Sequence, residues 1–234
     1  MAPPALLLVF SDPGDKVSES EFQDWYDSEH VPLRIDIPAF KSWKRLKAFN
    51  DQTPPWAAIY DLTSFEDTQN PPYTTLAETR SEREKDILSK LKLLDRRIYE
   101  LYQGAPIHPP SPSFHEKTSA PYVAFILVDV KPEAEEEYNR FYDEEHIPLL
   151  SKIPGWLRSR RFVLKDWART GTGVQKGEKA PPKYLLVSEY AHFDGQHSEE
   201  FKQAMNTPWR EKITKELEVF ERRFYTHYKS WERE

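Results

Sequence analysis

The chain has 234 residues and a formal net charge of −6, from 33 Lys and Arg against 39 Asp and Glu. This acidity, and the lack of a basic stripe interleaved with aromatic residues, argue against a nucleic-acid partner. The chain has no cysteine, which excludes disulfides, thiolate metal sites and a cysteine nucleophile. No apolar stretch approaches the roughly 20 residues of a membrane span, so we expect a globular protein with no membrane partner. The lack of disulfides is compatible with the cytoplasmic location that we expect.

The first half of the chain alternates apolar strands with helices. Residues 5–10 form an apolar run that predicts a buried strand rather than a signal peptide, because no charged segment precedes it. The next segment carries apolar residues at helical spacing from Phe22 to Leu33, and the helix should end before Pro32. The predicted elements are, in order, a strand at 5–10, a helix at 18–30, strands at 42–49 and 56–62, a helix at 75–94 with Leu94 in its core, and a strand at 97–102.

The second half repeats this order after a proline-rich segment at 104–121, which we expect to be an extended linker. Its predicted elements are a strand at 122–129, a helix at 133–146, strands at 158–164 and 184–190, a helix at 198–217 and a strand at 222–228. The largest insertion, 165–183, is rich in Gly, Lys and Pro. Such a composition favours a mobile loop, which could cover a pocket.

The two halves are copies of each other. Residues 21–45 and 137–161 align without a gap at an offset of 116, with ten of 25 positions identical. We therefore predict two domains, at 1–103 and 122–234, each with the strand-helix-strand-strand-helix-strand order of a ferredoxin-like unit. One sheet with helices on a single face leaves its other face bare. The predicted fold class is α+β, with two ferredoxin-like repeats packed sheet-to-sheet as an intramolecular α+β barrel that a monomer can close.

The repeated phrase, Tyr-Asp-x-Glu-His followed by Val or Ile and Pro-Leu, resembles the dimeric α+β-barrel superfamily, and within it most closely the EthD-like domain in a tandem form. The resemblance covers both copies. It implies a cofactor-free enzyme of the decarboxylase, cyclase or dehydratase type acting on aromatic polyketides, although the superfamily also includes monooxygenases and haem-dependent branches. The family's helix-end histidine corresponds to His30 and His146.

The candidate catalytic residues cluster at the end of the first helix of each copy. On a wheel of about 100° per residue, Glu29 falls near the centre of the apolar face and His30 at its edge. A carboxylate there is costly unless it is paired or lines a cavity. A Glu, a His and a Tyr at that place could act as general acids or bases. The predicted catalytic set is His30, His146, Glu29, Glu145, Tyr26 and Tyr142.

A structural role would conserve the same residues. A histidine in the last turn of a helix can bind free carbonyls and interact favourably with the helix dipole. The glutamate could bridge to the arginine of the next strand, Arg45 or Arg161. Two experiments distinguish these roles, His30→Ala and His146→Ala, because capping predicts lost stability and a site predicts altered ligand binding.

The candidate substrate-binding residues lie on the predicted strands. A guanidinium pairs well with a carboxylate or enolate, although an exposed strand face would also carry arginines. Strand alternation should aim about half of the strand aromatics into the barrel, where they would line or simply fill a pocket. The predicted substrate-binding set is Arg45, Arg161, Trp43, Trp56, Tyr60, Trp156 and Tyr184.

We expect neither a metal site nor a cofactor. The histidines outside the repeated motif show no recognised ligand spacing, and no glycine-rich phosphate loop is present. A single histidine could still serve as a haem ligand. The leading hypothesis is a cofactor-free enzyme that decarboxylates, dehydrates or cyclises a small aromatic or polyketide-like substrate in the barrel cavity. The alternatives are a non-catalytic small-molecule-binding or stress-associated barrel and a cofactor-free monooxygenase of phenols.

Overall fold

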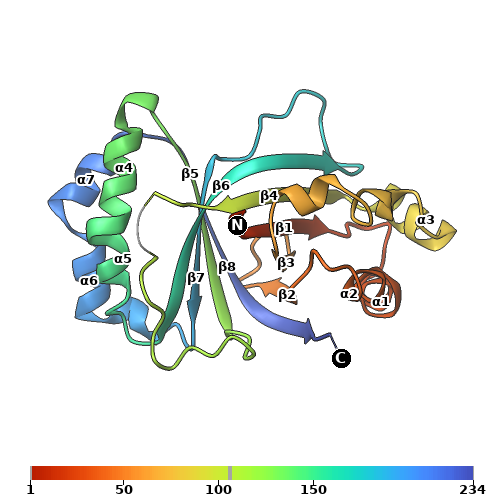
Figure 1. Cartoon of the computed structure of the whole chain (residues 1–234), viewed down its shortest axis with the longest axis horizontal. Coiled ribbons are helices and arrows are strands. Elements are labelled where there is room, and N and C mark those ends of the chain that lie inside the picture. Colours follow the sequence, from red (N-terminus) through yellow and green to blue (C-terminus); the bar gives the residue numbers. More distant parts are fainter. Residues whose placement is uncertain (1, 105–106, 234) are drawn as a thin grey trace. The chain divides into compact units, whose positions relative to one another are not determined.

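The computed structural model describes residues 2–104 and 107–233 (Figure 1). Its contacts divide the chain into two compact units. Unit 1 comprises the described residues up to Leu101 together with 164–181 and the described residues from Tyr228. Unit 2 comprises the described residues of Tyr102–Val163 and Pro182–His227. Unit 1 thus takes two short segments from the second half of the chain.

Unit 1 is built around strand β1 (Ala5–Asp12), which pairs antiparallel with both β3 (Trp56–Leu62) and β4 (Leu93–Leu101). Strand β2 (Trp43–Ala48) pairs with β3. Leu7 lies opposite Tyr60 on one side and Ile98 on the other. The helical elements are α1 (Glu19–Trp25), the π-helical η1 (Tyr26–His30), α2 (Pro32–Ile35), the 3-10 helices η2 (Glu66–Gln69) and η3 (Thr74–Ala77), and α3 (Glu82–Lys90).

Unit 2 has the same pairing pattern around its own first strand. Strand β5 (Tyr122–Val130) pairs antiparallel with β7 (Tyr184–Tyr190) and β8 (Leu217–Trp231), and β7 pairs with β6 (Trp156–Thr170). Helices α4, α5, α6 and α7 lie along one face of this sheet (Figure 1). The helical elements are η4 (Pro132–Ala134), α4 (Glu135–Phe141), the π-helical η5 (Tyr142–His146), α5 (Ile147–Leu150), η6 (Asp194–His197), α6 (Glu199–Met205) and α7 (Pro208–Thr214).

The strands are hydrogen-bonded in the order β1-β3-β2-β8-β5-β7-β6-β4, which is that of a closed barrel. The predicted α+β class is therefore confirmed. Of the described residues, none lie in a helix long and apolar enough to cross a membrane.

The first helix of each unit does not end before its proline as predicted. It widens into a π-helical turn, in which the amide of Val31 donates to the carbonyl of Tyr26 at 3.1 Å, five residues back. Helix then continues from Pro32, which is tolerated at a first helical position because no donor is needed there. The wider turn rotates the residues after it, so that Leu33, predicted on the apolar face, is 50% exposed and Arg34 is buried instead.

The second helix of each unit is shorter than predicted. Of the helix predicted at 75–94 in unit 1, only Glu82–Lys90 form an α-helix. Leu94, a predicted helix-core residue, lies in β4. In unit 2 the predicted helix at 198–217 is split before Pro208. Thr207 is extended there, with φ −85° and ψ 148°, because a proline disfavours helical backbone in the residue before it. The hydrophobic spacing alone did not show these ends.

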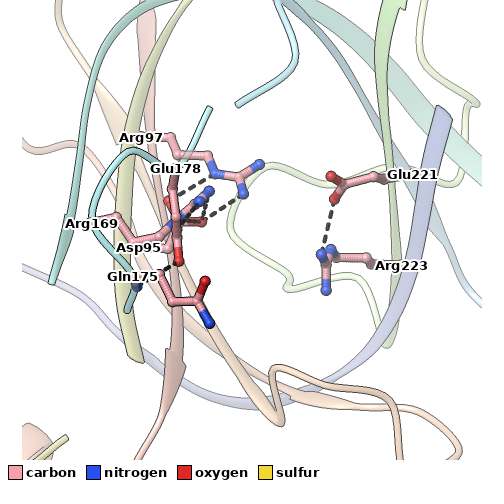
Figure 2. A network of polar contacts seen from close by, with 7 residues as sticks. All are labelled: Asp95, Arg97, Arg169, Gln175, Glu178, Glu221 and Arg223. Carbon is pink, nitrogen blue, oxygen red and sulfur yellow. Dashed lines mark hydrogen bonds and ion pairs between the residues drawn. The ribbon is translucent and has the colours of Figure 1, made fainter. Parts of the chain in front are cut away.

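The insertion at 165–183, predicted to be a mobile loop, is largely tied to unit 1. Strand β6 extends through it to Thr170, and the amides of Thr172 and Gly173 donate to the carbonyls of Leu91 and Lys92. A buried carboxylate adds to this attachment: Asp95 accepts hydrogen bonds from Arg97 and from Arg169 of the insertion (Figure 2). Arg169 in turn pairs with Glu178 at 2.5 Å.

The equivalent closing strand of unit 2 carries the same acid-x-Arg pattern. Arg223 of β8 donates to Glu221 at 2.9 Å, just as Arg97 of β4 donates to Asp95 (Figure 2). Burial lowers the pKa of the Arg97 guanidinium, but the hydrogen bonds and the charge of Asp95 raise it more, so that Arg97 is charged. Each closing strand thus holds a charge pair that the hydrophobic pattern does not predict.

Candidate functional site

The predicted site residues of unit 1 lie between its sheet and its helices. Trp56 and Tyr60 of β3 share a hydrophobic cluster with Phe22 and Tyr26 of the first helix. The rings of Trp56 and Phe22 are 6.3 Å apart. The sequence prediction placed these strand side chains in a cavity lined by both sheets, on the opposite face of the sheet. Alternation along a strand predicts two faces but cannot tell which of them the helices cover.

His30 is bonded to a carboxylate that the sequence prediction did not include. Its Nδ1 lies 2.9 Å from Oε1 of Glu84 on α3, and the two side chains are 13% and 2% exposed. Arg34 is the next charge, since its Nη2 lies 3.7 Å from the same Oε1 and its Nη1 donates to the carbonyl of His30. The end of the first helix therefore supplies His30 and Arg34, and the first turn of α3 supplies Glu84.

The electrostatics of this group fix the protonation state of His30. Burial, more than any other cause, lowers its pKa to about 3, and the cation of Arg34 acts in the same direction. Burial raises the pKa of Glu84, but its hydrogen bond with His30 and the nearby arginines lower it more, so the net pKa is below the ordinary value. At neutral pH a neutral imidazole therefore faces a carboxylate. Because a carboxylate only accepts, Nδ1 must carry the proton, which leaves the Nε2 lone pair as the base.

Tyr26 and the buried Arg45 lie beside His30, and Tyr60 lies beside Tyr26. The ring of Tyr26 is 4.8 Å from the imidazole, and the guanidinium of Arg45 lies 3.9 Å from the Tyr26 ring centre. Burial raises the pKa of Tyr26 and, further, that of Tyr60. Both phenols are therefore protonated at neutral pH and can donate hydrogen bonds. Arg45 Nη1 donates to the side-chain oxygen of Gln23, while its Nη2 has no hydrogen-bond partner among the described residues.

Trp43, another predicted substrate-binding residue, lies at the edge of this group. Its ring stacks at 6.4 Å on Phe40, which in turn meets Tyr60 edge-on at 5.5 Å. Trp43 is buried, and its indole N–H has no hydrogen-bond partner in the described parts of the chain. Trp43 therefore belongs to the same aromatic cluster as Tyr60.

Glu29, predicted to be catalytic, does not contact His30. It accepts a hydrogen bond from the hydroxyl of Ser81, the N-cap of α3. In unit 2 the Thr207 hydroxyl, which caps α7, donates to Glu145 at 2.5 Å. The repeated glutamate therefore anchors the first helix to the cap of the second in both units, which is a structural contact.

His146 occupies the equivalent place in unit 2 but has different neighbours. Counting from the caps Ser81 and Thr207, the position of Glu84 is taken by Arg210, and Leu150 stands where Arg34 would be. The imidazole stacks on Phe141 at 5.0 Å, and its Nδ1 is buried with no hydrogen-bond partner in the described chain. Burial, with Arg210 beside it, lowers the His146 pKa to about 3. Within the described residues, no carboxylate bonds to this Nδ1 as Glu84 bonds to that of His30.

The other predicted residues of unit 2 bond to further side chains of the same unit. Arg161 bonds to Asp143 at 2.9 Å and lies 4.9 Å from the ring of Tyr142. The Tyr184 hydroxyl donates to Glu135, and the Trp156 indole N–H donates to Ser159 at 2.9 Å. These polar groups are satisfied inside the unit, which is what buried structural side chains require. Unit 1 therefore holds the stronger candidate site.

Sequence reasoning missed Glu84 and Arg34. Ser81-x-x-Glu84 reads as a capping box, and the Ser81 hydroxyl does accept from the Glu84 amide at 2.9 Å. The Glu84 carboxylate, however, reaches His30 instead of the cap. In 2–104 and 107–233, no group of three His, Asp or Glu side chains is placed to hold a metal ion.

Comparison with known proteins shows the fold and leaves the family open. No family model matches the chain, and no curated protein does. Similar solved structures include a putative monooxygenase of Fusobacterium nucleatum, which is 12% identical with a TM-score of 0.58 over 99% of this chain and 95% of that chain. An anthrone oxidase-like protein is 10% identical with a TM-score of 0.54 over 99% and 93% of the two chains.

A third similar structure is a putative monooxygenase of Lactobacillus acidophilus, 13% identical with a TM-score of 0.52 over 99% of this chain and 97% of that chain. At such identities the likeness establishes a shared fold and does not establish a shared activity. The predicted EthD-like assignment stays a prediction. This chain has the fold of proteins named as monooxygenases and anthrone oxidase-like proteins.

Proposed function

We propose that the chain is a cofactor-free enzyme that removes a proton from a small phenolic or enolisable aromatic molecule, using His30 of unit 1 as the base. The observation that carries this proposal is the buried bond of 2.9 Å between His30 Nδ1 and the Glu84 carboxylate. A carboxylate behind an imidazole holds the tautomer whose other nitrogen can accept a proton, and it stabilises the imidazolium that forms.

The neighbouring groups can serve the same step. Removal of the substrate proton by Nε2 leaves a phenolate or enolate, and protonated tyrosines such as Tyr26 and Tyr60 can donate hydrogen bonds to such an anion. The positive charge of Arg45, 3.9 Å from the centre of the Tyr26 ring, would also stabilise the anion. The resulting carbanion could then lose a leaving group or close a ring, as the EthD-like resemblance implies.

Reaction with oxygen is the second candidate, and the names of the similar structures favour it. In that reaction the deprotonated substrate gives electrons to O2. A methylene group of an anthrone becomes a carbonyl, and the second oxygen atom leaves as water. The protein's part is the same proton removal, so that both candidates depend on His30.

A tandem arrangement fits this proposal. We propose that domains near 1–103 and 122–234, with the linker between them, are diverged copies of an EthD-like unit packed sheet-to-sheet. Their matching strand pairings and π-helical turns support the duplication. In this proposal unit 1 keeps the base and unit 2 keeps only the scaffold.

Hydrogen–deuterium exchange tests the proposal directly. Anthrone is incubated in deuterated buffer without oxygen, and loss of its methylene protons is followed by NMR. We expect exchange above the buffer rate, reduced about 100-fold or more by His30→Gln, because general bases contribute about 10²–10⁴. The matched control, His146→Gln, should stay within about threefold.

Admission of oxygen then separates the two candidates. Oxygen uptake with quinone formation would support the oxygenase, whereas exchange without uptake would support elimination or cyclisation. Equal exchange rates in the wild type and His30→Gln, with both proteins folded, would refute a base at His30. If both rates also equal the buffer rate, the non-catalytic binding protein is favoured.

A further inference from the structure

Arginines outnumber carboxylates around the His30–Glu84 pair. Arg34 and Arg80 both lower the pKa of Glu84. Arg80, the residue before the Ser81 cap, has a buried Nε with no hydrogen-bond partner within the described residues. Arg34 Nη2 forms an ion pair with Glu84 at 3.7 Å, which is too long for a hydrogen bond. Two guanidiniums therefore share one carboxylate and keep donor capacity unused.

Acidic groups do not balance these cations at the imidazole. The charges that act most on His30 are Glu84, Arg34 and Arg45, of which only the first is acidic. Glu29 lies next to His30 in the chain, but its carboxylate is bonded to the Ser81 hydroxyl. The end of the first helix in unit 1 is thus a positive, partly buried place with one neutral base.

Unit 2 lacks this arrangement. The residue before its Thr207 cap is Asn206, and Leu150 stands in the place of Arg34. Arg34 and Arg80 are therefore present in unit 1 and replaced in unit 2, at the same end of the unit. Folding of this unit type does not require them, because unit 2 builds the same π-helical turn and the same cap contact without them.

We infer that the substrate of the proposed enzyme is an aromatic carboxylate, whose carboxylate binds Arg34 and Arg80 beside His30. This inference rests on the proposed function for the role of His30. A guanidinium presents a fork of donors that matches a carboxylate. The acid group is a handle that stays in the product, because pairing with arginines stabilises the carboxylate in the ground state and so opposes loss of CO2.

A bound anion would also activate the base. In the free protein burial, and after it the cation of Arg34, lowers the His30 pKa to about 3, at which an imidazole is a weak base at neutral pH. A carboxylate that neutralises the arginines removes this influence and raises the His30 pKa. An aromatic carboxylate would therefore be deprotonated faster than a neutral analogue such as anthrone.

Binding of two inert probes tests this inference without turnover. Benzoate and benzamide have the same ring and differ in charge, and calorimetry measures both dissociation constants at low salt. We expect benzoate to bind at least about tenfold tighter, because charged hydrogen bonds exceed neutral ones by about 1.4 kcal/mol, which is tenfold in affinity. Arg80→Gln should remove this preference. Arg83→Gln is the matched control, since Arg83 lies three residues further along the chain, in α3, and pairs with Asp24 on the surface.

NMR of the wild-type imidazoles gives a second measurement that needs no variant. Saturating benzoate should raise the His30 pKa by at least about one and leave His146 unchanged. Equal binding of benzoate and benzamide, an unaltered preference in folded Arg80→Gln, or a His30 pKa that benzoate does not move would each overturn the anion site. The exchange assay with anthrone, which carries no carboxylate, would still report on His30 as a base.

Discussion

Lowering the pH from 7.5 to 5 should destabilise the protein through two buried imidazoles, His30 and His146. Each has a pKa lowered from 6.5 to about 3, chiefly by burial. Above pH 6.5 each ring is neutral in both the folded and the unfolded chain, so its full contribution to stability is present. Below pH 6.5 the unfolded ring is protonated, whereas the folded ring stays neutral down to about pH 3. Stability must therefore fall across this range.

The magnitude follows from the same numbers. A fall in pKa from 6.5 to about 3 corresponds to about 5 kcal/mol per histidine, at 1.36 kcal/mol per pKa unit. At pH 5 the unfolded ring is mostly protonated, and the loss is about 2 kcal/mol for each ring. The side chain of His30 is 13% exposed and His146 is 8% exposed, so that solvent screens little of this cost.

Urea unfolding followed by tryptophan fluorescence at pH 7.5 and pH 5 measures this loss. The wild type should lose about 4 kcal/mol in total, or about 2 kcal/mol in each transition if the units unfold separately. His30→Gln and His146→Gln should each remove about half of the pH dependence, and the double variant should remove most of it. His197→Gln, at an exposed position, should change little. A double variant that loses as much stability as the wild type would refute the reasoning.

Two further substitutions test the packing around the site and the insertion. Glu84→Ala leaves Arg34 without its carboxylate and should lower the free energy of unfolding in urea by about 3–5 kcal/mol. Arg210→Ala, at the equivalent and partly exposed position, should lower it by under about 1 kcal/mol. Similar losses in the two variants would contradict the ion pair. Gly171→Ala should cost more than Gly177→Ala, by about 1–3 kcal/mol in the same assay. Both have positive φ, but a Cβ at 171 would lie 2.4 Å from a backbone oxygen and one at 177 meets nothing within 4 Å; equal costs would show that this approach relaxes freely.

Much of the fold could be predicted from the sequence because hydrophobic alternation and the internal repeat agree. Residues such as Leu7 and Tyr60, which the strand pattern places on sheets, lie opposite each other in β1 and β3. The helix ends could not be predicted in the same way. A wheel of about 100° per residue assumes a regular helix, and the π-helical turn at Tyr26–His30 breaks that assumption. The wheel therefore put Leu33 inside and missed Arg34.

The site shows why a repeat can mislead about function. Matching the two copies selects what they share, and the shared Glu29 and Glu145 turn out to bond to helix caps, as the fold of either unit would need. Glu84 could not be selected in this way, because its equivalent is Arg210. If one copy kept an activity that the other lost, the residues that matter would lie among the differences. The pairing of His30 with Glu84, absent around His146, is such a difference, and it makes unit 1 the place where chemistry should be sought.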